Sequence, residues 1–539
     1  MIENYLQTLV KDAAEQLGLS LSVSQVVIET SKDAAHGDYA TNIAMQLSRQ
    51  LRKNPREVAS QLIARLDQSK MEKIEIAGPG FINFFLKPSA LTQYIPLIIE
   101  QGENFGNGAK QQKTVNIEFV SANPTGKLHL GHARGASVGD SLARLFTKSG
   151  YEVIKEFYVN DAGVQINNLG HSLYTRYLNL LGINKAMPEN GYFSEDLIAI
   201  AQMLMDEVGD AYKEENDTSL EFFKSRGSSI FLDIIRQDLA AFKVIFDVYS
   251  FESKVKEKDA ISRLLTKLAP YTYVEEGATF LRTTQFGDDK DRVIIKSNGE
   301  HTYFLPDIVY HLDKLGRKAD LLIDVLGADH HGYIGRMKSA LQMFGYGPET
   351  LEVQIIQMVR IIKDGEELKM SKRTGNAITL EELIAEVGVD AARYFFIAKS
   401  ASTHFDFDLN LAQERTSANP VYYAQYAHAR LSAVLSKGTI YPLDTSGNGL
   451  HTAEELSLVK QLIAYPGVVL DATTTREPYK VANYIQKLAS LVHSYYTEVR
   501  ILDDTNPLLT SARLGLSKAT QIILKDALSL LGVSAPISM

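Results

Sequence analysis

The chain has 539 residues, of which 45% are hydrophobic and 22% charged, proportions typical of a globular protein with several domains. It contains no cysteine, which excludes disulfides, thiolate catalysis and cysteine-ligated zinc and fits a reducing cytoplasm. The net charge of −9 argues against a general electrostatic attraction to nucleic acid, although local basic patches could still bind one. No window approaches the roughly 18 consecutive apolar residues of a membrane span, and the charged N-terminus does not resemble a secretory signal.

The first 105 residues predict a small α+β domain. Three amphipathic stretches indicate helices: residues 2–17, 40–51 and 55–66. Lys73–Ala77 and Phe81–Leu86 alternate like paired strands on either side of a Gly-Pro-Gly turn. The polar stretch 102–113 has the composition of a linker and marks the first domain boundary.

From residue 111 to about residue 405 the pattern becomes an alternation of strands and helices. We expect strands at 114–120, 152–159, 319–326 and 351–361. This alternation predicts an α/β domain with a doubly wound, Rossmann-like parallel sheet, whose ligands lie at the carboxyl ends of the strands. A mainly helical insertion at about 165–317 interrupts the alternation. It ends in predicted hairpin strands at 279–284, 293–297 and 301–305.

Residues 415–539 predict a separate α-helical bundle. After Lys399 we expect no further strand. Amphipathic stretches indicate four helices instead: residues 419–435, 453–472, 478–500 and 511–531.

The most informative stretch is NPTGKLHLGHARGASVGD, residues 123–140, which follows the strand predicted at 114–120. Asn123–Gly126 forms a turn pattern, and a helical pattern begins at Leu130. Three glycines then fall four residues apart along one helix face: Gly131, Gly135 and Gly139. Because each costs about 1 kcal/mol relative to alanine in a helix, we expect them to permit close approach to a sheet or a ligand.

A turn followed by a helix N-terminus attracts anions, since unpaired N–H groups and the helix dipole point toward it. The sequence places Lys127, His129 and His132 there, and the two histidines can face one ligand. Three interpretations compete: histidines that cap a buried helix, a metal site, and a nucleotide phosphate site. The metal interpretation lacks a third ligand at suitable spacing. The nucleotide interpretation gains support from a second motif.

That second motif is LKMSKRTGN, residues 368–376, in which Lys369, Lys372 and Arg373 surround a serine. Taken alone, such a basic stretch is usually a solvated loop. Combined with an HxGH motif at the switch point of a sheet, it predicts a loop that folds over a triphosphate and neutralises charge as pyrophosphate leaves.

HLGH and KMSKR, in this order and separation, resemble the two signature motifs of class I aminoacyl-tRNA synthetases. The similarity to arginyl-tRNA synthetases of bacterial type runs nearly from end to end. It is carried by residues 122–140 and by six further segments: YVNDAGVQ (158–165), YFLPDIVYH (303–311), GADHHGYI (327–334), NPVYYAQYAHAR (419–430) and, in the N-terminal domain, HGDYATNIA (36–44) and GPGFINFFL (78–86). Many members lack the second lysine of KMSKR, whereas this chain has both Lys372 and Lys127, so which lysine dominates phosphate stabilisation stays open.

The resemblance implies a tRNA-binding domain at 1–105, a catalytic domain at 111–405 and an anticodon-binding domain at 415–539. It implies that arginine and ATP, with substrate-associated Mg²⁺ and no structural metal, give arginyl-adenylate and pyrophosphate. Arginine then moves to the 2′-hydroxyl of the terminal adenosine of tRNA(Arg). The implied catalytic residues are His129, His132, Lys369, Lys372 and Lys127. The implied ATP-binding residues are Thr125, Gly126, His129, Gly131, His132, Gly327, Asp329, Met370, Ser371 and Lys372. A monomeric, cytoplasmic enzyme without membrane contact is expected.

An arginine pocket should offer carboxylates in a planar, bidentate arrangement to the guanidinium. The resemblance implies a set of arginine-binding residues: Glu118, Asn123, Tyr303, Asp307 and His330. Glu118 has an alternative interpretation, a charge at the end of a strand that pairs with a nearby lysine. The Asp329-His330-His331 cluster also has one, a polar loop.

The residues implied in tRNA binding are Tyr423, Tyr426, Arg430, Asn42 and Phe81. Tyrosines at this helical spacing are more often core residues than stacking partners of unpaired bases, so both interpretations stay open.

Three rival functions compete with this one: a small-molecule nucleotidylyltransferase, a non-catalytic tRNA-binding relative, and a synthetase for another amino acid. The first needs neither the helical domain nor KMSKR. The second should have lost the motifs, and the third predicts a pocket without Glu118 and Asp307. Phe246–Ser253 resembles a family pattern, and we assign it no role.

Overall fold

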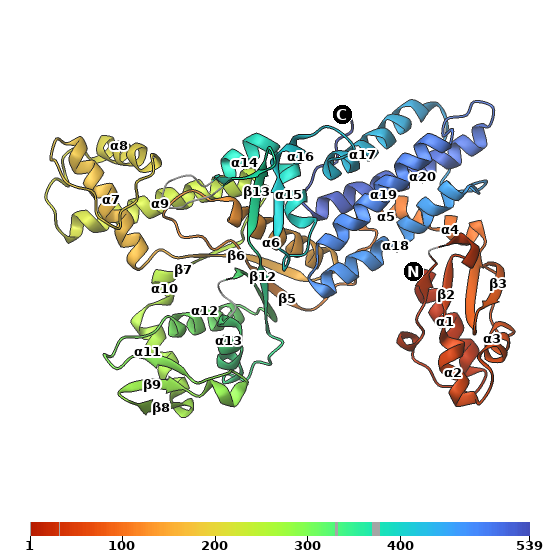
Figure 1. The fold of residues 1–539 in the computed structure, drawn as a ribbon, viewed down its shortest axis with the longest axis horizontal. Helices are drawn as coiled ribbons and strands as arrows, with labels where there is room; N and C mark the ends of the chain where they lie inside the picture. Colours follow the sequence, from red (N-terminus) through yellow and green to blue (C-terminus); the bar gives the residue numbers. More distant parts are fainter. Residues whose placement is uncertain (1, 32, 329–331, 369–377) are drawn as a thin grey trace.

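The computed structural model describes residues 2–31, 33–328, 332–368 and 378–539. The molecule is elongated, with the N-terminal domain near one end and the helices of the first insertion, α7–α9, at the other (Figure 1). The central sheet lies between these ends, and the C-terminal helical bundle extends from it alongside the N-terminal domain.

The N-terminal domain is a four-stranded sheet of order β1-β2-β4-β3 with helices packed on it. Its elements are α1 (Ile2–Glu15), β1 (Glu29–Thr30), β2 (Tyr39–Thr41), α2 (Ile43–Leu51), α3 (Pro55–Ile63), β3 (Met71–Ala77) and β4 (Phe81–Leu86). The next two helices, α4 (Pro88–Thr92) and α5 (Tyr94–Gln101), pack against the C-terminal helical bundle. The predicted β3–β4 hairpin is confirmed as antiparallel. The helix predicted from residue 40 is wrong at its start, because Tyr39–Thr41 pairs with β4 instead.

The central sheet has five parallel strands in the order β12-β11-β5-β6-β7, which confirms the doubly wound class. The strands are β5 (Thr114–Glu118), β6 (Glu152–Val159), β7 (Val248–Phe251), β11 (Leu321–Gly327) and β12 (Leu351–Ile356). The chain runs outward from β5 to β6 and β7, then returns to build β11 and β12 on the other side. The switch point between β5 and β11 is therefore where a ligand crevice forms.

The predicted insertion is divided in two by β7, an edge strand that the sequence reading did not find. β7 lies within the segment 246–253, to which we assigned no role. The first inserted part is helical: α7 (Val164–Leu180), α8 (Asp196–Val208) and α9 (Asp217–Ala241). The second contains α10 (Glu252–Val255), α11 (Lys258–Leu268), β8 (Thr272–Glu275), β9 (Ala278–Leu281) and β10 (Arg292–Ile295). The strand predicted at 301–305 is wrong: His301 makes one isolated bridge to Ile295, and α12 (Phe304–Gly316) then begins.

The strand predicted at 351–361 is two strands in two sheets. β12 ends at Ile356, and β13 (Val359–Lys363) belongs to a small sheet with β14 (Glu366–Glu367) and β15 (Phe405–Asp408). β15 also corrects the expectation that no strand follows Lys399, because it pairs in parallel with β13.

The remaining helices pack around the central sheet or form the bundle. Near the sheet lie α6 (Leu130–Lys148), α13 (Tyr333–Gln342), α14 (Leu380–Val387), α15 (Val389–Ile397) and α16 (Leu409–Gln413). The bundle consists of α17 (Pro420–Lys437), α18 (Ala453–Thr475), α19 (Tyr479–Glu498) and α20 (Pro507–Leu530), which confirms the four predicted helices. No helix in the described ranges has the length and apolarity required to cross a membrane.

Candidate active site

The turn between β5 and α6 is held in an unusual backbone conformation. Val120 and Ser121 have φ angles of 68° and 42°, a region that non-glycine residues, and β-branched ones above all, rarely adopt. The Ser121 hydroxyl donates to Glu118 Oε1 at 2.9 Å and accepts from the backbone N–H of Tyr158 at 3.1 Å. These bonds anchor the strained turn to the ends of β5 and β6.

Two of the three glycines of α6 have different surroundings. A Cβ at Gly139 would overlap the buried ring of Phe119, so this position lets the helix approach the residue that follows β5. A Cβ at Gly135 would have no atom within 4 Å, because this position borders open space. One glycine thus serves close packing against the strand end, and another faces a possible ligand.

His129 and His132 are arranged as a capping box at the start of α6. His129 Nδ1 accepts from the Gly131 N–H at 3.1 Å, and His132 Nδ1 accepts from the His129 N–H at 3.1 Å. The ring centroids lie 3.8 Å apart. Since each Nδ1 accepts a hydrogen bond, the neutral imidazoles carry their proton on Nε2, the tautomer that donates through Nε2. Capping and phosphate binding are therefore compatible for these histidines.

A cavity of about 610 Å³ opens at the start of α6, between the carboxyl ends of β5, β11 and β12. Its described lining is Val120, His129, Gly131, His132, Gly135, Val325, Leu326, Gly327, Ala328, Ile356, Gln357, Met358 and Val359. The predicted ATP-binding residues His129, Gly131, His132 and Gly327 meet in this one cavity. Thr125 and Gly126 lie in the preceding turn and are not among its described lining residues. Six predicted residues lie outside the described part of the chain: Asp329, His330, Lys369, Met370, Ser371 and Lys372.

The described residues that follow the second signature motif pair through their backbone with the first. The Leu130 N–H donates to Ile378 O at 3.3 Å, and the Leu380 N–H donates to Leu128 O at 2.8 Å. The chain that leaves the second motif thus runs beside the first turn of α6.

Lys127 makes ion pairs with carboxylates on two helices, α14 and α8. Its Nζ lies 2.9 Å from Glu381 Oε2 on α14 and 3.4 Å from Asp196 Oδ1 on α8. The hydrogen bond to Glu381 raises the pKa of Lys127. In this conformation the lysine ties the HLGH turn to the helix that follows the second motif.

Asp307 and Tyr303, two predicted arginine-binding residues, lie at the start of α12. Burial raises the pKa of the Asp307 carboxyl to about 6, although His311 and Arg336 act in the opposite direction. Among the described residues, no cation forms an ion pair with this carboxylate. Tyr303 is 76% exposed, and Lys256 Nζ lies 5.3 Å from the centroid of its ring.

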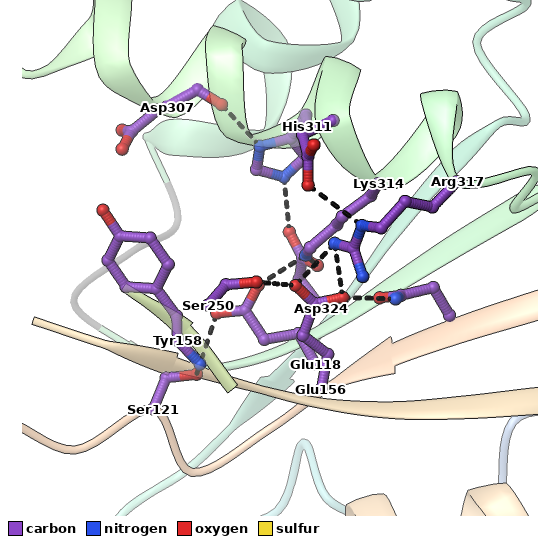
Figure 2. A network of polar contacts seen from close by, with 12 residues as sticks. Glu118, Ser121, Glu156, Tyr158, Ser250, Asp307, His311, Lys314, Arg317 and Asp324 are labelled. Carbon is purple, nitrogen blue, oxygen red and sulfur yellow. Dashed lines mark hydrogen bonds and ion pairs between the residues drawn. The ribbon is translucent and has the colours of Figure 1, made fainter. Parts of the chain in front are cut away.

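Glu118 belongs to a buried charge network below Asp307 (Figure 2). Its Oε2 accepts from Lys314 Nζ at 2.5 Å, and the same Nζ donates to Asp324 Oδ1 at 3.0 Å. His311 connects Asp324 Oδ2, 2.8 Å from its Nε2, to the backbone oxygen of Asp307, 2.8 Å from its Nδ1. Burial opposes a charge on Lys314, but Asp324 and Glu118 outweigh it and raise the pKa of the lysine.

This geometry matches the alternative interpretation of Glu118, a strand-end carboxylate paired with a lysine. Sequence reasoning missed Lys314, His311 and Asp324. Two signals were present: Asp307, His311 and Lys314 fall on one face of a helix, and Asp324 interrupts the apolar run LLIDVLG.

A third carboxylate of the network, Glu156 on β6, is compensated by several donors. Both of its oxygens accept from Arg317 Nη2, at 2.8 and 2.9 Å. Asn116 and Ser250 donate to it at 2.5 and 2.6 Å. The predicted residue Asn123 lies farther out, where its Nδ2 donates to Gln165 Oε1 at 2.5 Å.

The residues predicted to bind tRNA lie in two places. In the bundle, the Arg430 guanidinium lies 4.5 Å from the Tyr426 ring centroid and 4.8 Å from that of Tyr496, and the Tyr423 ring lies 4.3 Å from that of His493. Tyr423 and Tyr426 are half-buried, between the core and stacking interpretations.

The other two lie in the N-terminal domain. The pairing of Thr41 with Ile82 brings Asn42 and Phe81 to the same end of β2 and β4. Asn42 also accepts from Gln46 through its side chain, at 2.9 Å.

A parallel sheet with an HxGH helix start at its switch point, followed by a helical bundle, defines a class I aminoacyl-tRNA synthetase. Comparison with known families agrees. Residues 4–86 match the arginyl tRNA synthetase N terminal domain, 94–435 the catalytic domain of tRNA synthetases class I (R), and 424–539 the DALR anticodon binding domain.

Relatives named arginine–tRNA ligase match over the whole chain. That of Bacillus subtilis is 49% identical and that of Geobacillus kaustophilus 48%, each over 100% of this chain and 99% of the relative. A Campylobacter jejuni arginyl-tRNA synthetase structure superposes with a TM-score of 0.78 at 35% identity, covering 84% of this chain and 100% of that one. The Thermus thermophilus enzyme, 21% identical, shares the fold over the full length of both chains with a TM-score of 0.76. The chain belongs to the arginine–tRNA ligase family, and its reaction is the attachment of arginine to tRNA(Arg).

Proposed function

We propose that arginine is activated in the 610 Å³ cavity, where the start of α6 holds the phosphates of ATP. His129 and His132 donate from Nε2 to phosphate oxygens, and the helix N-terminus adds its dipole. Preorganised donors of this kind stabilise the charge that develops as pyrophosphate leaves, and one donor is commonly worth about 100- to 1000-fold in rate. Mg²⁺ enters with ATP. Among the described residues, no group of three or more His, Asp or Glu is placed to hold a metal ion.

The observation that carries this proposal is the backbone pairing of residues 128–130 with residues 378–380. Val359 lines the cavity and begins the strand that leads toward the second motif, while Ile378 lies beside Leu130 as the chain returns. The chain that follows the segment containing Lys369 and Lys372 therefore lies beside the start of α6, and the strand that leads toward this segment begins at the cavity wall. We assign these two lysines to the leaving pyrophosphate. Lys127 joins them only if it leaves its two carboxylate partners.

We assign the guanidinium of arginine to Asp307, with Tyr303, Asn123 and His330 completing the pocket. Glu118 is already paired with Lys314, so we leave it to the charge network below Asp307. A desolvated carboxylate with a pKa near 6 and no ion-pair partner among the described residues is stabilised when a guanidinium binds. An uncharged analogue would leave that charge buried and unpaired, so the pocket needs no editing domain for such competitors.

In the second step, the aminoacyl group moves from the adenylate to the 2′-hydroxyl of the terminal adenosine of tRNA. Tyr423, Tyr426 and Arg430 are assigned to the anticodon side, and Asn42 and Phe81 to a contact of the N-terminal domain with the tRNA. Half-buried aromatic and guanidinium faces suit stacking with unpaired bases. We place the enzyme in the cytoplasm as a monomer. Light scattering with purified protein tests whether it is monomeric.

Arginine-dependent ATP–pyrophosphate exchange tests the proposal most directly, run with and without tRNA(Arg) against a panel of amino acids. We expect exchange with arginine only when tRNA is present. Exchange with arginine in both conditions would retain the pocket and remove the tRNA requirement. Exchange with another amino acid would overturn the assignment of Asp307.

A further inference from the structure

Arg134, on the second turn of α6, is completely buried yet has no carboxylate partner among the described residues. Its guanidinium donates to three backbone carbonyls instead. Nη1 donates to Gln357 O at 2.8 Å, and Nη2 donates to Ser400 O at 2.9 Å and to Thr403 O at 3.0 Å. Burial lowers the pKa of Arg134 to about 10, and the cation is held by these carbonyl dipoles and by the Phe405 ring, whose centroid lies 5.8 Å from Cζ. Such a costly arrangement indicates a specific task.

The first of these carbonyls belongs to the wall of the nucleotide cavity. Gln357 and Met358 form the crossover in which the chain leaves the central sheet at β12 and enters the small sheet at β13. Ile356, Gln357, Met358 and Val359 all line the cavity. The Gln357 N–H donates to Ala401 O at 3.0 Å, so the crossover is fixed on both sides of one residue.

The opposite wall of the same cavity comes from α6 itself, through His129, Gly131, His132 and Gly135. Arg134 lies within that stretch of helix, two residues beyond His132. A single side chain thus connects the helix that holds the phosphates to the crossover that faces it. The planar fork of a guanidinium can serve separate carbonyls in fixed directions, which the single ammonium of lysine cannot reproduce.

We propose that Arg134 is a positioning residue that sets the width of the ATP pocket by holding the 356–359 crossover at a fixed distance from α6. This inference rests on the proposed function, because it concerns the site assigned to ATP. Since Arg134 contacts neither Asp307 nor Tyr303, its effect is confined to the nucleotide and does not extend to arginine.

Arg134→Lys in the full-length enzyme tests this, with Michaelis constants measured separately for ATP, arginine and tRNA. We expect the KM for ATP to rise about 10-fold, with the KM values for arginine and tRNA within about 2-fold of wild type. Saturating ATP should restore most of kcat, because the phosphate ligands themselves are intact. A merely structural role would lower the melting temperature or the active fraction without this selectivity.

Arg393→Lys is the matched control. Arg393 is equally buried and also donates to carbonyls, of Leu531 and Phe242, but it lies away from the cavity lining and pairs with Asp140. The Arg393→Lys substitution should lower the stability of the protein and leave the KM for ATP unchanged. The inference would be overturned if the KM for ATP rose equally in both variants. It would also be overturned if Arg134→Lys raised the KM values for ATP, arginine and tRNA together.

If Arg134→Lys does not fold, Gln357→Pro removes the other attachment of the crossover, the N–H that donates to Ala401. It should give the same ATP-selective rise in KM, and an unchanged KM for ATP would count against the inference. Wild-type exchange activity is measured alongside. Its absence would refute the proposed function, whereas its presence with no ATP selectivity in the variants would refute only the role of Arg134.

Discussion

Asp307→Asn should weaken arginine binding and stabilise the folded protein at the same time. Loss of a charge-assisted pair in a desolvated pocket typically costs about 2–5 kcal/mol, which corresponds to a rise of about 30- to 5000-fold in the KM for arginine. The KM for ATP should change little, because Asp307 is not part of the nucleotide cavity lining.

The wild-type enzyme should also lose affinity for arginine as the pH falls. With a pKa of about 6, Asp307 without arginine is about 97% ionised at pH 7.5 and about 24% at pH 5.5. Because only the ionised form attracts the guanidinium, the KM for arginine should rise about fourfold over this interval. The amide of the Asp307→Asn variant does not titrate in this pH range, so the variant's KM for arginine should not change between pH 5.5 and 7.5.

The stability effect has a definite sign. The folded pKa of this acid lies above its ordinary value of 3.8, so ionised Asp307 costs the folded state at most about 3 kcal/mol at pH 7.5. This cost is complete above about pH 6 and disappears below about pH 4. Asp307→Asn should therefore raise the melting temperature at pH 7.5, by on the order of 5 °C, and not at pH 4. A fall in melting temperature at pH 7.5, or a pH-independent KM in the wild type, would refute the reasoning.

Lys314→Met should destabilise the protein by about 3–5 kcal/mol, because Glu118 and Asp324 lose their shared buried cation, and Glu118→Gln should partly rescue it; thermal melts of single and double variants check this. Additive effects in the double variant would contradict the pairing. Gly139→Ala should lower the melting temperature by several degrees, because its Cβ would overlap Phe119, whereas Gly135→Ala should leave stability within about 1 kcal/mol. Arg430→Ala should raise the KM for tRNA about 10-fold and leave the KM values for arginine and ATP unchanged, as measured by aminoacylation; a change confined to arginine would contradict the assignment.

Features that depend on a few neighbouring residues could be predicted from the sequence. The limits of β6 and the hairpin of β3 and β4 follow from alternation and turn residues, and the bundle helices follow from their apolar periodicity. Asn54 before α3 accepts from the Arg56 N–H at 3.0 Å, as the Asn-Pro pair indicates. The HxGH helix start is equally local, since His129 and His132 cap one helix turn.

Strand assignments failed where partners in distant parts of the chain decided them. Tyr39–Thr41 became a strand because β4 was available to pair with it, and Phe405–Asp408 because β13 was. The four residues of β7 carry too short a pattern to be recognised alone, and only their parallel pairing with β6 makes them part of the central sheet.

The sequence by itself supplied the candidate site groups: the histidines at the helix start, the Asp307 carboxylate proposed for the arginine pocket and the glycines of α6. Only the tertiary structure decided which charges neutralise one another. Glu118 meets Lys314 across 196 positions, and Lys127 meets Glu381 across 254. Periodicity and capping act over a few residues, so neighbouring positions in the sequence are enough to recognise them. An ion pair or an anchoring guanidinium such as Arg134 finds its partners only when sheet topology has brought separate segments together.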